Sequence, residues 1–218
     1  NRLAHAYAEH QAGRLAAAVD IYTEILARDP NQPYALHLLG EIAHRTGMNE
    51  RAILLIERAI QLNPSHAESH NNLGAAYQAL GYLDRAETSY RNALRLDPTL
   101  SVARNNLGTV LKAQGRKDDA RREFEKALAL DASCVEARLN IGNSLREAND
   151  WPGAESWYRL TIKLHPNCAA AWNNLGIALL ALLTALGLSG PTVFFGLTIF
   201  MGLGNGICLP NANAGMLS

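Results

Sequence analysis

Apolar residues recur along this chain at the spacing of an amphipathic helix. Leu36, Leu39, Ile42 and Ala43 stand at i, i+3, i+6 and i+7, which places them in one stripe along a helix of 3.6 residues per turn. A second stripe follows after a short polar break and consists of Ala52, Leu55, Ile56, Ala59 and Ile60. The pattern predicts two consecutive helices that bury one face each, and therefore an all-α structure.

The two-helix pattern returns every 34 residues. Four registers share this period: Pro30, Pro64, Pro98 and Pro166, with Ala132 in the open place; Gly13, Gly47, Gly81 and Gly115, followed by Asn149; Ala18, Ala52, Ala86, Ala120 and Ala154; and Tyr22, Ile56, Tyr90, Phe124 and Tyr158. A fixed period of this length indicates stacked repeats. We expect repeats at about 1–32, 33–66, 67–100, 101–134 and 135–168, and a partial repeat at 169–182.

Two residue types set the shape of each repeat. Proline cannot continue a helix and moves the preceding residue out of the α region, so Asp29-Pro30 and its equivalents end the second helix of each pair. Gly40 lies inside a first helix, where a side chain would push the partner helix away. We therefore expect the two helices to approach closely at this point.

The order of these residues resembles the tetratricopeptide repeat (TPR) motif, in which Leu73-Gly74-x-x-Tyr77 is followed by Ala86-x-x-x-Tyr90 and Pro98. Trp172-x-x-Leu175-Gly176 matches the opening of the motif, so the resemblance covers residues 1–176. It implies a right-handed superhelix of antiparallel helix pairs, with the first helix of each pair lining the concave face. It also implies that the chain binds a protein or peptide partner.

Asparagine occupies the matching first-helix positions of four repeats. These are Asn72, Asn106, Asn140 and Asn174, preceded in three repeats by Asn71, Asn105 and Asn173, and Asn143 lies one turn after Asn140. An amide both donates and accepts hydrogen bonds, so such a row can bind the backbone of an extended peptide. Asparagine ladders of this kind resemble the TPR arrays of O-linked N-acetylglucosamine transferases, which hold protein substrates. Asparagine is also frequent at this position in TPR proteins with other ligands, so ordinary repeat usage is the alternative.

Lys112 and Arg146 are the cations expected on the same face, and we include them among the candidate peptide-binding residues. A carboxylate clamp needs cations at set places on three successive first helices, because point charges grip a terminal carboxylate better than amides do. Those places mostly hold Asn, Leu or Ala, so we do not expect a clamp.

No pattern in the chain predicts catalysis, a metal or a cofactor. His66 with His70, and His37 with His44, have the spacing of metal-binding pairs but lack a third ligand, so we expect loop and surface histidines. The sequence shows no glycine-rich phosphate loop, nucleophile elbow or acid–base pair. The chain itself is therefore not expected to be an enzyme.

Charge excludes one class of partner and also marks a break in the chain. Lys and Arg number 20 and Asp and Glu number 20, whereas general nucleic-acid binding needs a basic excess. The last charged residue is Lys163. Residues 177–218 are apolar enough to predict one or two transmembrane-like helices, and Arg159 and Lys163 before them predict that the repeats lie in the cytoplasm.

Part of this tail resembles a late helix of drug-efflux transporters of the major facilitator class, through Gly204-x-Gly206-x-x-x-Pro210-Asn-Ala. Three explanations stay open: a membrane-tethered repeat protein, a join of two reading frames, and unrelated apolar sequence. The first residue, Asn1, suggests a fragment.

Three functions fit these observations. The first is a protein-interaction scaffold that binds an extended peptide in its groove. The second is the substrate-recruiting part of a larger glycosyltransferase-type enzyme. The third is a membrane-anchored adaptor or a chimera with a transporter fragment.

Overall fold

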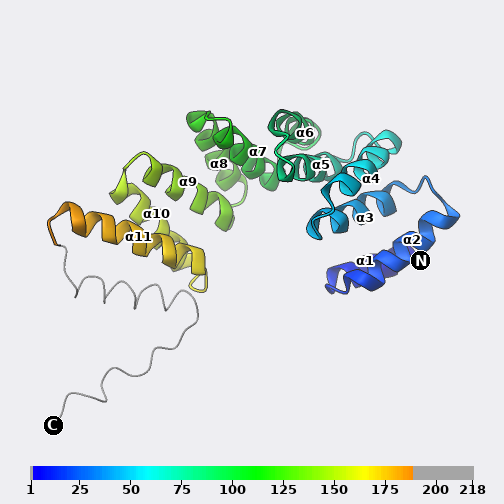
Figure 1. The fold of residues 1–218 in the computed structure, drawn as a ribbon, viewed down its shortest axis with the longest axis horizontal. Helices are drawn as coiled ribbons and strands as arrows, with labels where there is room; N and C mark the ends of the chain where they lie inside the picture. Colours follow the sequence, from blue (N-terminus) through cyan, green and yellow to red (C-terminus); the bar gives the residue numbers. More distant parts are fainter. Residues whose placement is uncertain (1, 189–218) are drawn as a thin grey trace, which may run out of the picture. The chain divides into compact units, whose positions relative to one another are not determined.

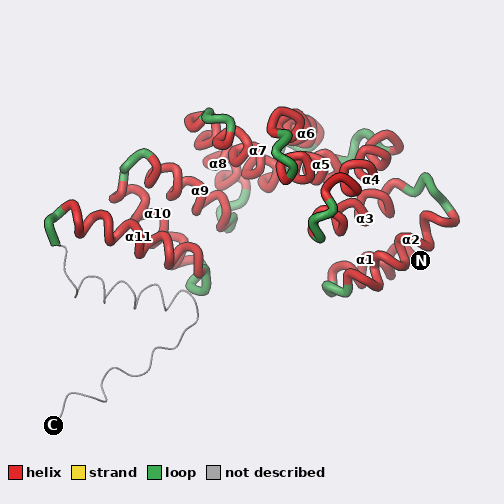
Figure 2. Tube along the Cα trace, in the orientation of Figure 1, coloured by secondary structure: helices red, strands yellow, loops and turns green. Residues whose placement is uncertain are grey.

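The computed structural model describes residues 2–188, and in this part the backbone forms α-helices and no strand (Figures 1 and 2). The helices are α1 (Arg2–Gln11), α2 (Leu15–Arg28), α3 (Pro33–Arg45), α4 (Asn49–Leu62), α5 (Ala67–Ala79), α6 (Leu83–Leu96), α7 (Ser101–Ala113), α8 (Lys117–Leu130), α9 (Val135–Glu147), α10 (Trp151–Leu164) and α11 (Ala169–Ala185). The predicted all-α helical repeat is confirmed.

The chain divides into two compact units, Asn1–Ala120 and Arg121–Ser218, with the division inside α8. In the first unit the pairs α1–α2, α3–α4 and α5–α6 are antiparallel hairpins, and each second helix also contacts the first helix of the next pair (Figure 1). In the second unit α9 and α10 form a hairpin, and α11 packs against both. Each unit thus buries its apolar stripes between neighbouring helices.

The turn inside each hairpin needs a left-handed residue. Gly47 follows the last turn of α3 with φ +82°, and the next residue, Met48, donates its amide N–H to the carbonyl of Ala43 at 2.8 Å. This is a Schellman ending, which favours glycine because a Cβ is strained there. Asn149 occupies the same place in a later repeat with φ 62°, and asparagine tolerates this conformation better than most residues.

The glycine inside each first helix packs directly against the partner helix. A Cβ added to Gly40 would lie 2.5 Å from Cγ1 of Ile56, and one added to Gly74 would lie 2.7 Å from the ring of Tyr90. Both partners are almost fully buried. The predicted close approach is therefore confirmed, and it explains why a small residue precedes each large one by 16 positions.

The first apolar residues of the predicted tail, 177–185, belong to α11. Leu175, Gly176 and Ala178 are buried, and Leu175 and Ala178 belong to an apolar cluster with Tyr158 of α10. None of the helices within residues 2–188 is long and apolar enough to cross a membrane. The predicted transmembrane stretch therefore finds no support at residues 177–188, and its remainder, with the transporter-like motif, lies outside the described residues.

Candidate functional site

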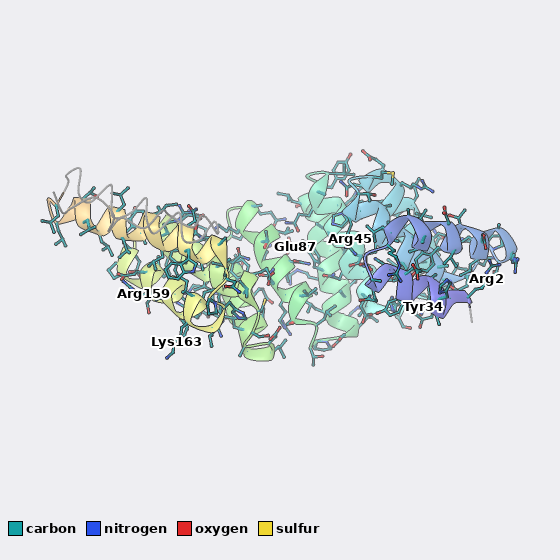
Figure 3. The ribbon with its side chains drawn as sticks, turned by 90° about the horizontal axis from the view of Figure 1, so that it is seen from below. Arg2, Tyr34, Arg45, Glu87, Arg159 and Lys163 are labelled. Carbon is teal, nitrogen blue, oxygen red and sulfur yellow. The ribbon has the colours of Figure 1, made fainter. Side chains whose placement is uncertain are left out.

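The first unit contains a groove of about 640 Å³ along its first helices. Its wall includes Tyr7 of α1, Tyr34 and Leu38 of α3, Asn72 of α5 and Val102 of α7. The side chain of Tyr34, at the start of α3, is labelled in Figure 3. The groove is thus built from four successive first helices of the stack.

Three exposed apolar side chains give the groove a contact surface. Tyr7 is 48% exposed, Tyr34 46% and Val102 49%. Tyr34 packs edge-on against His66, with ring centroids 5.4 Å apart. Aromatic rings held in this way offer large contact areas at little conformational cost, so they are suited to bind a ligand side chain.

The exposed residues of the groove also follow the 34-residue period, in two further registers. Tyr34 and Val102 stand in one 34-residue register with Glu68, and Tyr7 stands in another with Glu41. All five lie in the groove wall. The residue type in these registers varies between repeats, so the registers are less conspicuous than the constant asparagine register from which the site was predicted.

Among the described residues, the carboxylates of the groove wall are Glu41 and Glu68, and no described Lys or Arg belongs to the wall. One carboxylate oxygen of Glu41 lies 4.0 Å from Nη1 of Arg45 and 3.7 Å from Nε2 of His10. One carboxylate oxygen of Glu68 lies 3.4 Å from Nε2 of His66. The groove is therefore acidic.

A histidine cluster forms the floor of the groove between α3 and α5. The Oγ of Ser69 lies 3.0 Å from Nδ1 of His37 and 2.8 Å from Nδ1 of His66, so the hydroxyl can donate to one imidazole and accept from the other. Burial, assisted by the nearby His66 and His10, lowers the pKa of His37 to about 4. The prediction of a surface histidine is wrong for His37, which is 5% exposed, because α5 covers it.

Within the first unit, the asparagine amides bind one another. Nδ2 of Asn106 donates to Oδ1 of Asn71 at 3.1 Å, and Nδ2 of Asn71 donates to Oδ1 of Asn72 at 3.2 Å. Asn71 and Asn105 are each 8% exposed, whereas Asn72 and Asn106 are half-buried. Part of the row therefore connects α5 to α7, and of these four residues Asn71 and Asn72 reach the groove.

A similar amide contact occurs in the second unit. Oδ1 of Asn143 accepts from Nδ2 of Asn174 at 3.0 Å and from the hydroxyl of Tyr158 at 2.9 Å. Asn140 is half-buried and Asn173 is exposed. This contact connects α9 to α11, and peptide binding by the row stays a prediction.

The two candidate cations are half-buried, and neither is among the residues that line the groove. Lys112 belongs to the last turn of α7 and Arg146 to the last turn of α9. Burial raises the pKa of Tyr158, and the positive charge of Arg146 acts against this shift. Arg146 therefore contributes to the electrostatics of a buried tyrosine.

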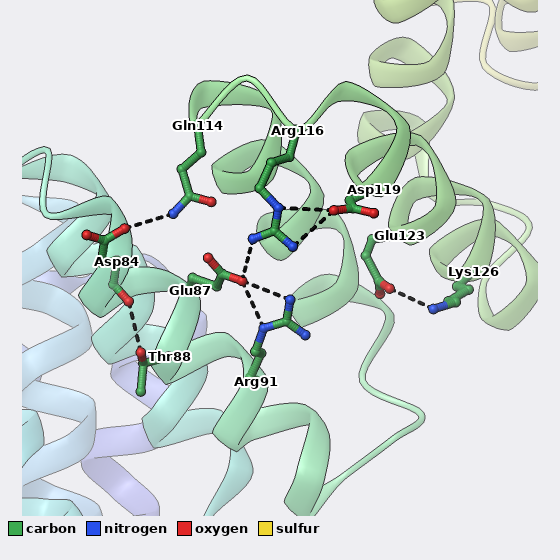
Figure 4. Close-up of polar contacts among 9 residues, drawn as sticks. All are labelled: Asp84, Glu87, Thr88, Arg91, Gln114, Arg116, Asp119, Glu123 and Lys126. Atoms are coloured by element: carbon green, nitrogen blue, oxygen red, sulfur yellow. Dashed lines mark hydrogen bonds and ion pairs between the residues drawn. The ribbon is translucent and has the colours of Figure 1, made fainter.

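A second polar cluster in the first unit has a structural role (Figure 4). Arg116 bridges Oε1 of Glu87 at 2.9 Å and Oδ2 of Asp119 at 3.0 Å, and Arg91 also contacts Glu87 at 2.8 Å. Burial alone would raise the pKa of Glu87, but the hydrogen bonds from Arg91 and Arg116 outweigh it and lower the pKa. Each charge in this cluster has a partner. In the part of the chain that the structure describes, no three His, Cys, Asp or Glu side chains are placed to hold a metal ion.

The repeated helical hairpins place this chain in the class of α-helical repeat proteins. The tetratricopeptide repeat family matches residues 9–71, 65–133 and 105–167. Over these residues the chain belongs to the tetratricopeptide repeat family. A comparison of the sequence with curated proteins gave no match.

Solved structures of similar fold support the assignment. PilW, a type IV pilus biogenesis factor, has a TM-score of 0.79 at 18% identity, with 92% of this chain and 90% of that chain covered. The thermophilic TPR protein TTC0263 of Thermus thermophilus has a TM-score of 0.71 at 23% identity, with 83% and 98% covered. YrrB, a TPR protein with an unusual peptide-binding site, has a TM-score of 0.59 at 19% identity, with 83% and 90% covered. At these identities the likeness concerns the fold.

Proposed function

We propose that this protein-interaction scaffold binds an extended peptide segment of a partner protein in the groove of its first unit. The carrying observation is the groove itself, whose wall combines exposed tyrosines with the amide of Asn72. Its volume of about 640 Å³ lies in the range of ligand-binding clefts, roughly 300–1,000 Å³. The fold of YrrB, described as having a peptide-binding site, is similar.

The contacts of the asparagines support different roles for different members of the row. Asn72 uses its oxygen to accept from Asn71, and its amide hydrogens can be donated to a backbone carbonyl of a bound peptide. Asn106 donates its amide N–H to Oδ1 of Asn71 on the neighbouring first helix, and Asn71 donates its own amide N–H to Asn72. Of the asparagines in the groove wall, Asn72 can therefore offer amide hydrogens to the peptide, beside the side chains of Tyr7 and Tyr34.

A binding measurement tests this proposal. Peptides of about 12 residues, which extend to roughly 40 Å, are selected from a random displayed library against the full chain and measured by fluorescence anisotropy. Asn72→Ala and Tyr34→Ala should each weaken binding by roughly threefold to tenfold, the value of about one hydrogen bond or one aromatic contact.

Asn167→Ala is the matched control, because Asn167 is exposed, lies in the second unit and is not one of the candidate peptide-binding residues. Circular dichroism establishes that all three variants are folded. Equal affinity of the wild type, Asn72→Ala and Tyr34→Ala would contradict binding in this groove.

The substrate-recruiting role within a larger glycosyltransferase-type enzyme and the membrane-anchored adaptor stay predictions from the sequence. Proteins of this family are generally non-catalytic scaffolds, which favours the scaffold over an activity in the described residues.

A further inference from the structure

We infer that the peptide bound in the groove carries a lysine or arginine next to an apolar side chain. This inference rests on the proposed function and specifies its ligand. It follows from the charges of the groove wall and from the position of the exposed tyrosines among them.

The groove has an excess of negative charge. Within residues 2–188, its wall contains two carboxylates, Glu41 and Glu68, and no Lys or Arg. Their side chains are 32% and 57% exposed, so both can be reached by a ligand. A carboxylate binds an ammonium or guanidinium group through charge-assisted hydrogen bonds, which are stronger than neutral ones.

The pairing of Glu68 differs from that of two other carboxylates of the first unit, Glu9 and Glu87. Glu9 is bound by Arg14 at 2.5 Å, and Glu87 is bound by two arginines. Among the described residues, the ion-pair partner of Glu68 is His66, which is charged only when protonated. Glu68 therefore keeps capacity for a cation supplied by a ligand.

Glu41 already has a cationic neighbour, but the contact is loose. Nη1 of Arg45 lies 4.0 Å from the carboxylate, and the Arg45 side chain is 50% exposed. Exposed ion pairs of this kind contribute little to stability. A peptide cation can therefore compete with Arg45 for Glu41.

Apolar surface lies beside both carboxylates. Tyr34 and Leu38 belong to the same helix as Glu41, and Val102 belongs to the next first helix after that of Glu68. A peptide side chain such as Leu or Phe can pack on these residues, and a neighbouring Lys or Arg can also lie over a tyrosine ring. The wall thus fits a basic and apolar segment better than an acidic one.

The test uses the library described above with the full chain. The enriched peptides should contain Lys or Arg adjacent to an aliphatic or aromatic residue more often than unselected clones do. In the double variant Glu41→Gln/Glu68→Gln, a selected peptide should bind about tenfold more weakly, because each charge-assisted contact becomes a neutral one. Added salt should weaken wild-type binding more than binding to this variant.

The control is Asp20→Asn/Glu50→Gln, which removes the same charge from exposed positions on the second helices α2 and α4. It should bind the peptide within about twofold of the wild type, because its changes lie outside the groove. Circular dichroism again establishes folding.

The outcomes separate this inference from the proposed function. Enriched peptides without basic residues, or unchanged affinity of Glu41→Gln/Glu68→Gln, would overturn the inference. If Tyr34→Ala still weakens binding in that case, the groove function stands with another ligand. If neither variant changes the affinity, or no peptide is enriched, both proposals fail.

Discussion

Replacing Tyr90 with alanine is expected to lower the free energy of unfolding by about 3–5 kcal/mol, the usual cost of removing a buried aromatic ring. Tyr90 is 1% exposed, and its ring packs against Gly74 of the partner helix α5. The surrounding backbone cannot close the space fully, because Gly74 has no side chain with which to fill it. Urea denaturation followed by circular dichroism measures the loss.

Tyr90→Phe is the matched control for the ring. It keeps the packing and removes the hydroxyl, which donates to Oε1 of Gln78 at 2.9 Å. We expect a cost of about 1 kcal/mol, the net value of one hydrogen bond. If Tyr90→Ala were no more destabilising than Tyr90→Phe, packing of α6 against α5 would not be the main source of stability at this hairpin.

Acidification is expected to destabilise the first unit through His37. Its pKa is lowered to about 4 in the folded chain from an ordinary value of 6.5. Above pH 6.5 the imidazole is neutral in the folded and unfolded states, so it does not favour unfolding. As the pH falls below 6.5, the unfolded chain binds a proton that the folded chain excludes, and by pH 4 this removes about 3 kcal/mol of stability.

His37→Gln should remove this part of the pH dependence. The glutamine does not titrate, so its stability should fall less than that of the wild type between pH 6.5 and pH 4, whatever its stability at neutral pH. His5→Gln is the control, because His5 is exposed on α1. Parallel stability curves for His37→Gln and the wild type would show that burial of His37 does not control the acid response.

The helices could be predicted from the sequence because they depend on local spacing. Each hairpin turn needs a left-handed residue and each close helix contact needs a small one, so Gly47 and Gly40 identify both features without a structure. The buried partner of each such helical glycine follows 16 residues later, Ile56 after Gly40 and Tyr90 after Gly74. The 34-residue period of the sequence therefore identifies the same residues that pack between the two helices of each repeat.

The contacts between repeats could not be predicted in the same way. Nδ2 of Asn106 reaches Asn71, which is 35 residues earlier, and Nδ2 of Asn174 reaches Asn143, which is 31 residues earlier. Comparing residues exactly 34 apart does not reveal such diagonal pairs. His37 is buried for a related reason, because its cover, Ser69, comes from the next repeat, at a separation of 32.

The central claim is that the first helices of the first unit bind a peptide, and nuclear magnetic resonance tests it most directly. On titration of the labelled chain with a selected peptide, the signals of Tyr34, Asn72 and Val102 should shift. Those of Leu54 and Tyr82, which are exposed on or next to the second helices, should not. Shifts confined to Leu54, Tyr82 and their neighbours, with the groove residues unchanged, would contradict the account.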